Sequence, residues 1–105
     1  MTSYDELAFQ IISLAGDGRG KLTEAMKHAR KNNFGKAADC LREADKVLLK
    51  AHELQTQELL KKYADGTLTE PLNVVITHAQ DYVMTALAMR DMVEEIINLY
   101  AKLNK

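Results

Sequence analysis

The sequence predicts an all-α protein, in which residues 1–105 form one domain of three helices packed as an antiparallel bundle. A chain of 105 residues is close to the commonest domain length and can bury a core without disulfides. Apolar residues make up 47% and charged residues 28%, with one proline and no tryptophan, which is typical of a globular chain built from helix formers. Three long segments repeat apolar residues at three- and four-residue steps, as amphipathic helices do.

The first helix is expected to run from Ser3 to a turn at residues 32–33. Ser3 and Glu6 have the spacing of a capping box, in which both side chains bind backbone N–H groups at the helix end. The glycine-rich residues 16–20 interrupt the segment, and each interior glycine costs about 1 kcal/mol against alanine. The apolar residues that follow nevertheless keep the same helical face: Leu22, Met26 and Ala29. One continuous helix is therefore predicted.

The second and third helices are separated by a turn rich in small and polar residues. The second is expected over residues 34–64, and Gly66 ends it because glycine readily adopts the left-handed conformation of a C-terminal cap. The third is expected to start at residues 69–71, since proline in a first turn has no N–H to leave unpaired. It should end near Lys102.

The third helix has two apolar sides when its residues are placed at 100° steps. One side consists of Leu72, Ile76, Ala79, Val83, Ala86 and Leu87. The other consists of Val74, Met89, Met92, Ile96 and Leu99, with His78, Asp81, Tyr82 and Thr85 among them. Two neighbouring helices can cover only one side, so we expect another copy of the chain against the second, with His78 and Asp81 at or near the contact.

Charge and cysteine content narrow the classes of function. Lys and Arg number 14 against 15 Asp and Glu, which argues against a nucleic-acid partner. The single cysteine, Cys40, cannot form an internal disulfide or a multi-cysteine zinc site, which favours a reducing compartment. The acidic start of the chain lacks the basic stretch of a secretory signal, and residues 71–89 are too polar for a bilayer. A cytoplasmic protein is expected.

Several residues that could carry chemistry have a plainer explanation. Residues 16–21 lack the G-x-x-x-x-G-K-[ST] spacing of a phosphate loop and follow no strand, so the glycines are expected to allow close helix packing. Cys40 has no histidine at helical spacing to activate it, so an inert thiol is expected. His28, among basic residues, is expected at the surface, and His52 is expected to have a packing or supporting role.

His78 is the strongest candidate for chemistry. Asp81 and Thr85 follow it three and seven residues later, so an imidazole, a carboxylate and a hydroxyl share one stripe of an apolar helix. Burying these groups costs free energy unless they are paired or used. From these residues alone, a functional site and a structural polar stripe remain equally open.

Three segments together carry a resemblance. They read AGDGR at residues 15–19, AHELQT at residues 51–56 and VVITHAQDYVMT at residues 74–85. They resemble, in register along the chain, the lactose/cellobiose-type IIA components of the bacterial phosphoenolpyruvate-dependent sugar phosphotransferase system. The resemblance implies a three-helix subunit that assembles into a homotrimeric nine-helix bundle.

The resemblance also implies the function of a phosphoryl carrier. His78 would accept the group from the histidine phosphocarrier protein and pass it to a cysteine of a IIB component, which serves a membrane IIC permease for a lactose-, cellobiose- or chitobiose-type sugar. Asp81 would bind Mg²⁺ or another divalent cation, one per trimer. Residues expected to line the phosphoryl site are Gly16, Gly18, Val74, Gln80, Tyr82 and Thr85. Gln80 is turned about 160° from His78 on the helical wheel, and Tyr82 stands where the family motif usually has a second histidine.

Two other classes of protein compete with this interpretation. A histidine-containing phosphotransfer domain of two-component signalling is also helical, but it usually has lysine three residues after the histidine, where this chain has Asp81. A non-catalytic scaffold or metal-binding bundle would use His78 and Asp81 only as buried polar residues. A scaffold would take up no label from phosphoenolpyruvate, so a labelling experiment separates it from a carrier.

Overall fold

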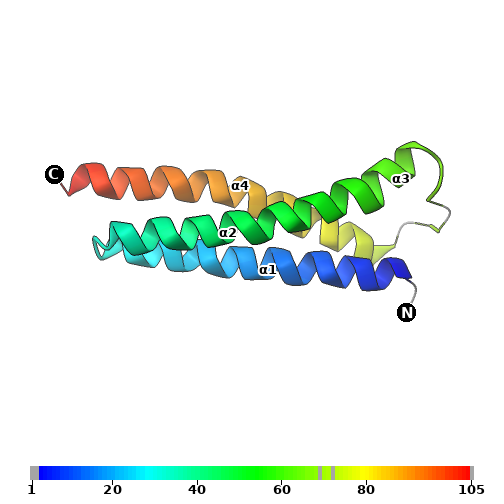
Figure 1. The fold of residues 1–105 in the computed structure, drawn as a ribbon, viewed down its shortest axis with the longest axis horizontal. Helices are drawn as coiled ribbons and strands as arrows, with labels where there is room; N and C mark the ends of the chain where they lie inside the picture. Colours follow the sequence, from blue (N-terminus) through cyan, green and yellow to red (C-terminus); the bar gives the residue numbers. More distant parts are fainter. Residues whose placement is uncertain (1–2, 69, 72, 105) are drawn as a thin grey trace.

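The computed structural model describes residues 3–68, 70–71 and 73–104, apart from the side chain of Ser3. Helices cover most of these residues, and no strand occurs among them. They are α1 (Ser3–Arg30), α2 (Phe34–Leu54), the π-helical segment η1 (Gln55–Leu60), α3 (Lys61–Ala64) and α4 (Val74–Leu103). Since α2, η1 and α3 are contiguous, the helices form the three antiparallel rods that the periodicity predicts (Figure 1). The bundle is elongated, measuring 55 × 23 × 19 Å.

The first rod, α1, is continuous through its glycines, as predicted. Gly18 is buried, and a Cβ atom placed on it would lie 2.5 Å from Cδ2 of Leu48 on α2. Gly20 is exposed and would meet nothing within 4 Å. Close packing of α2 on α1 therefore explains Gly18, as the sequence predicts, whereas it does not explain Gly20. The predicted capping box depends on the side chain of Ser3, which lies outside the described residues.

The second rod has the predicted bounds, but part of it is not an α-helix. Residues 55–60 form a π-helical turn, in which hydrogen bonds skip one residue more than in an α-helix. Gln55 begins this turn, is only 2% exposed, and its Oε1 has no hydrogen-bond partner among the described residues. The turns before and after the second rod contain residues in the left-handed conformation, with φ of 63° at Asn32 and 80° at Gly66. Gly66 thus takes the conformation expected of it.

The third rod begins later than predicted, so the assignment of its start to residues 69–71 is wrong. Helix α4 starts at Val74, and Pro71 precedes it; Thr69 lies outside the described residues. Asn73 is the N-cap, and its Oδ1 accepts a hydrogen bond of 2.9 Å from the N–H of Ile76. Its Nδ2 donates to Asp5 at 3.2 Å, which links this end of α4 to α1.

The core between the three rods is rich in alanine, whose small side chain lets helices approach closely. The fully buried alanines are Ala8, Ala15, Ala25, Ala29, Ala37, Ala44, Ala51, Ala79 and Ala86. The largest fully buried side chains are Ile11, Leu22, Leu48, Leu59, Ile76, Val83 and Val93. The predicted inner side of α4 is therefore buried at Ile76, Ala79, Val83 and Ala86, while Leu87 is half-buried and Leu72 lies outside the described residues.

One ion pair crosses between the second and third rods. The guanidinium of Arg90 donates from Nε to Oδ1 of Asp45 at 2.7 Å and from Nη2 to Oδ2 at 3.1 Å. Its Nη1 also pairs with Glu94 on α4. These bonds hold the pKa of Arg90 above its usual range. None of the described helices is long and apolar enough to cross a bilayer.

Candidate functional site

The second apolar side of α4 is exposed in a single chain. We call it the outer face; its most exposed apolar residues are Val74 (83%), Met92 (60%), Leu99 (57%) and Leu103 (73%). Met89 and Ile96 on the same side are half-buried. His78 and Asp81, which the sequence places among these residues, are also exposed. In a single chain neither group is therefore desolvated, and burial would follow only from a covering partner.

A hollow of about 450 Å³ opens on the outer face at the start of α4. Its lining consists of Asn73, Val74, Thr77, His78 and Asp81. Within the described part of the chain, no hydrogen bond or ion pair occupies the imidazole of His78 or the carboxylate of Asp81. Both groups are thus available to a ligand or to another protein.

The position of the hollow follows from the cap of α4. Asn73 caps the start of α4 beside the hollow. The side chains that line the same side come one turn later, at Thr77 and His78, and two turns later, at Asp81. Asn73 and Thr77 line the hollow but were not among the lining residues expected from the sequence. Their signal was present in the sequence, because asparagine is a favoured N-cap and Thr77 adjoins His78.

The ring of Tyr82 lies against the ring of His78. The two rings are stacked, with centroids 5.7 Å apart and planes inclined by 10°. Arg19 on α1 lies over the tyrosine ring, with Cζ 4.8 Å from the centroid. A Cβ atom placed on Gly16 would lie 3.5 Å from the Tyr82 hydroxyl. Tyr82 thus lies beside His78, whereas Gly16 lies beside the Tyr82 hydroxyl and is not among the residues that line the hollow; Arg19 was not among the expected site residues.

The remaining lining residues expected from the sequence lie elsewhere in the single chain. Gly18 packs against Leu48, and Gln80 lines a separate hollow formed with Leu59, Leu60, Tyr63 and Leu68. The hydroxyl of Thr85 donates to backbone oxygens of its own helix, at 2.9 Å and 3.1 Å. Gln80 lies on another side of α4 from His78, because side chains two residues apart along an α-helix point in nearly opposite directions. Gly18 is covered by Leu48 of α2. Neither lines the hollow at His78.

The other histidines and the cysteine do not line the hollow at His78. His28, expected at the surface, is half-buried near the end of α1, and His52 is exposed, which does not fit a packing role within one chain. Cys40 is buried, and its Sγ lies 3.8 Å from Oε2 of Glu24. Burial raises the pKa of the Cys40 thiol, and the nearby carboxylates raise it further. A buried thiol with a raised pKa is a poor nucleophile, which fits the inert thiol expected from the sequence.

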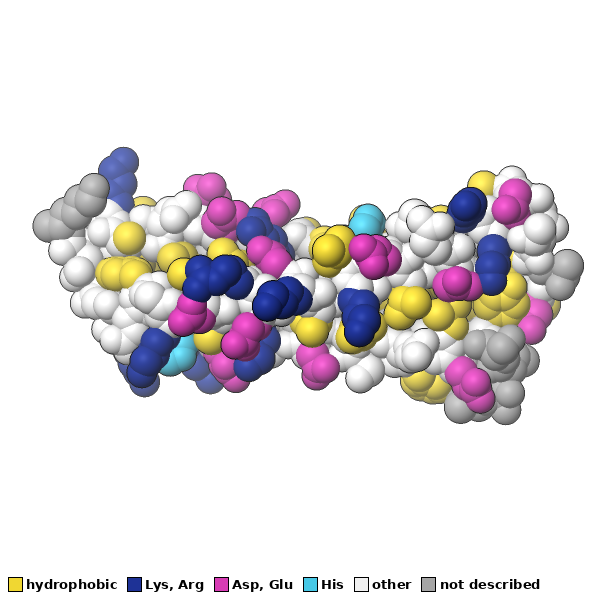
Figure 2. Space-filling model, viewed as in Figure 1, with side chains coloured by type: hydrophobic (Ala, Val, Ile, Leu, Met, Phe, Trp, Pro, Cys, Tyr) yellow, Lys and Arg dark blue, Asp and Glu magenta, His cyan; other side chains and the backbone are white. Residues whose placement is uncertain are grey.

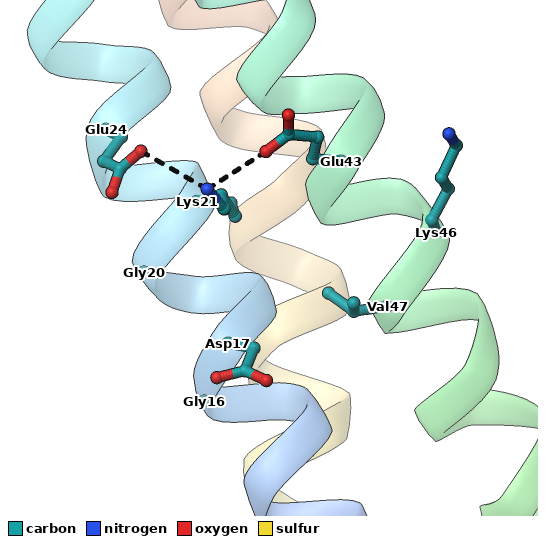
Figure 3. A pocket seen from close by; sticks show the side chains of 8 residues that line it. All are labelled: Gly16, Asp17, Gly20, Lys21, Glu24, Glu43, Lys46 and Val47. Atoms are coloured by element: carbon teal, nitrogen blue, oxygen red, sulfur yellow. Dashed lines mark ion pairs between the residues drawn. The ribbon is translucent and has the colours of Figure 1, made fainter.

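A larger hollow of about 530 Å³ lies between α1 and α2 (Figure 3). Lys21 occupies it between two carboxylates, 3.8 Å from Glu24 and 3.0 Å from Glu43. The hydrogen bond from Lys21 to Glu43 raises the pKa of the lysine, so these charges satisfy one another. Within the described part of one chain, no three His, Cys, Asp or Glu side chains are grouped to hold a metal ion.

Comparison with known sequences connects this geometry to a family. The model of the "PTS system, Lactose/Cellobiose specific IIA subunit" matches residues 6–101. The chain is 38% identical over 96 residues to the lactose-specific EIIA component of Streptococcus mutans, covering 91% of this chain and 90% of the relative. It is 39% identical over 101 residues to the lichenan-specific phosphotransferase enzyme IIA component of Bacillus subtilis, covering 96% and 90%.

Solved structures agree with the sequence relatives. The cellobiose-specific enzyme IIA of Bacillus anthracis superposes with a TM-score of 0.92 at 34% identity, over 99% of this chain and 94% of that one. The IIA(Chitobiose) of Escherichia coli, solved in complex with HPr, superposes with a TM-score of 0.83 at 26% identity, over the whole of both chains. The chain therefore belongs to the lactose/cellobiose-specific IIA family of the sugar phosphotransferase system.

Proposed function

We propose that this chain is a phosphoryl carrier that accepts a phosphoryl group on His78 from the histidine phosphocarrier protein and passes it to a cysteine of a IIB component. The observation that carries the proposal is the exposed His78 imidazole, which no hydrogen bond occupies within the described chain, in a member of the IIA family. The complex of the Escherichia coli relative with HPr supports the same donor. The sugar, of lactose, cellobiose or chitobiose type, would enter through a membrane IIC permease.

The chemistry requires an exchange of one bond for another. An unprotonated ring nitrogen of His78 supplies the electron pair of the new N–P bond, while the N–P bond of the donor breaks and its electron pair stays on the donor imidazole. In the second step a cysteine thiolate of IIB forms an S–P bond, and the electron pair of the N–P bond returns to His78. Both steps need in-line positioning and charge stabilisation more than a strong acid or base. An exposed histidine suits them because two proteins must reach it in turn.

The outer face supports assembly into a homotrimer, in which three copies of α4 meet inside a nine-helix bundle. Several large apolar side chains exposed along one side of a helix are typical of a site of protein contact. Val74, Met92 and Leu99 would then be covered by neighbouring copies, and His78 would lie at the edge of the contact. Sedimentation equilibrium should return about three times the chain mass of 11.8 kDa. A monomer at micromolar concentration contradicts this assembly.

Asp81 would hold the divalent cation in such a trimer. Among the residues that line the hollow in one chain, Asp81 is the carboxylate, so three copies would supply three carboxylates with oxygen ligands of the hard kind that Mg²⁺ prefers. The cation would neutralise carboxylates that otherwise repel one another or become protonated. Metal analysis should find about one divalent ion per three chains, and a chelator should lower the melting temperature. A metal-free trimer with an unchanged melting temperature contradicts the proposal.

The carrier function is tested by transfer of labelled phosphate from phosphoenolpyruvate through the phosphocarrier protein. The wild-type chain should acquire acid-labile, base-stable label, and His78→Ala should acquire none. The control variants His28→Ala and His52→Ala should be labelled like the wild type, because neither side chain lies at the hollow. Label that persists in His78→Ala places the phosphoryl group on another residue and removes the proposal.

A further inference from the structure

The contacts of Tyr82 suggest a role that exposure of His78 alone does not explain. Exposed and without a hydrogen bond in the described chain, the imidazole could adopt several rotamers, and only some would present a nitrogen in line with an incoming phosphorus. Among the described residues, the aromatic ring stacked on it is that of Tyr82, almost parallel and one helical turn away. Stacking of this kind restricts the tilt and rotation of both rings.

Tyr82 is in turn held by a second helix. The guanidinium of Arg19 lies over its ring, and Arg19 forms no ion pair with any carboxylate in the described part of the chain. A planar guanidinium is well suited to stacking on an aromatic face, and it keeps its positive charge. Gly16, also on α1, lies near the phenol, since a Cβ placed on it would be in ordinary van der Waals contact with the Tyr82 hydroxyl at 3.5 Å. The Tyr82 ring is therefore in contact with α1 as well as with His78 on its own helix.

We infer that Tyr82 is a positioning residue, which holds the His78 imidazole in the orientation for phosphoryl transfer, and that Arg19 fixes Tyr82 in place from α1. The inference rests on the proposed function of His78. The flat face of the phenol ring orients the His78 imidazole, and the Tyr82 hydroxyl has no part in this. The same contact brings the charge of Arg19 to the ring that adjoins the phosphorylated histidine, where it favours an anionic group.

Kinetics of phosphoryl transfer from the phosphocarrier protein to the intact chain test the ring. Tyr82→Leu removes the aromatic face and should lower kcat about tenfold, equivalent to about 1.4 kcal/mol, with KM changed less than about twofold. Tyr82→Phe retains the face and should recover most of that loss. Tyr63→Leu is the matched control, because Tyr63 is exposed and contacts neither His78 nor Arg19. A wild-type kcat in Tyr82→Leu, or a Tyr82→Phe as slow as Tyr82→Leu, overturns the inference.

Substitution of Arg19 tests whether Arg19 holds Tyr82 in place, in a chain that retains both the His78 and the Tyr82 rings. Arg19→Gln should lower kcat about threefold, less than the loss of the ring, and Arg19→Lys should fall between it and the wild type. Arg30→Gln, at the other end of α1, is the matched control and should keep the wild-type rate. If Tyr82→Leu does not fold, the Arg19 variants still test whether the contact between Arg19 and the Tyr82 ring affects the transfer rate. An unchanged rate in Arg19→Gln contradicts the role of Arg19.

Proton NMR of the unphosphorylated chain separates failure of this inference from failure of the proposed function. Stacking predicts nuclear Overhauser contacts between the ring protons of His78 and Tyr82, and an upfield shift of the His78 protons that disappears in Tyr82→Leu. If these signals are present and no variant is ever labelled, the stack exists and the carrier function is wrong. If the wild type is labelled and the contacts are absent, the positioning role is wrong.

Discussion

The two sides of α4 differ in what they bury and in what they expose. The inner side packs Ile76, Ala79 and Val83 against the other rods, while the outer face leaves Val74, near His78, and Leu99, near the other end of α4, exposed to solvent. The face of the bundle in Figure 2 differs again, because basic and acidic side chains are interspersed along it. One apolar stripe therefore serves folding, and the second is free to serve association. Substitutions on the outer face should therefore affect association, and substitutions on the inner side should affect the stability of the fold.

The largest effect is expected from a charge placed on the outer face. Leu99→Lys puts three cations into the contact of the proposed trimer, each at a desolvation cost of several kcal/mol, so the assembly should dissociate into folded monomers. Sedimentation equilibrium measures the mass, and circular dichroism the helix content. Asn98→Lys is the matched control, since Asn98 is exposed but lies off the outer face. An intact trimer in Leu99→Lys breaks the contrast between the two sides.

A smaller effect is expected from a cavity on the inner side. Ile76 is 1% exposed, so Ile76→Ala should lower the free energy of unfolding by about 2–5 kcal/mol. Val74→Ala, two residues earlier and 83% exposed, should change it by less than about 0.5 kcal/mol. Both are measured by urea unfolding in the Leu99→Lys background, where association does not add to stability. Similar losses in the two variants would mean that α4 has no covered side.

Two glycines of α1, Gly18 and Gly20, differ in the same way, because one is covered by a neighbouring helix and the other is exposed. Gly18→Ala should destabilise the chain by about 1–2 kcal/mol, because crowding against Leu48 outweighs the better helix propensity of alanine. Leu48 is fully buried and has little room to move. Thermal unfolding measures the change. A stabilised Gly18→Ala would show that α2 can shift away from α1.

The smallest effect, of opposite sign, is expected at Gly20. Nothing lies within 4 Å of a Cβ there, so Gly20→Ala should stabilise the chain by up to about 1 kcal/mol through helix propensity alone. It serves as the control for Gly18→Ala, because the residue type and the helix are the same. Destabilisation by Gly20→Ala would indicate a partner that covers this position.

The parts of the fold that depend on local pattern could be predicted. Apolar periodicity gave the three rods and the buried side of α4, and Gly66 marked the end of the second rod. The π turn could not be predicted, because its extra residue leaves no distinct pattern in a short window. The start of α4 was placed wrongly because Pro71 and Asn73 are both start signals; Asn73 caps the helix and also bonds to Asp5, a contact across 68 positions.

The candidate site was predictable to the extent that it lies on one helix. His78, Asp81 and Val74 share one side of α4 by spacing alone, and the structure places all three around one hollow. The contact of Arg19 with Tyr82 depends on the register between α1 and α4, which sequence periodicity does not reveal. The roles of His78 and Asp81 in phosphoryl transfer and metal binding stay predictions.

The π turn at Gln55–Leu60 changes how the second rod tolerates a change in length. Deleting one residue from an α-helix rotates everything beyond it by about 100°, which would turn buried side chains such as Leu59 away from the core. Within a π turn the same deletion removes the surplus residue and restores an α-helix whose two ends still face their neighbours. A variant of this chain that lacks one residue within this segment should therefore keep the same core, whereas the same deletion elsewhere in the second rod should not.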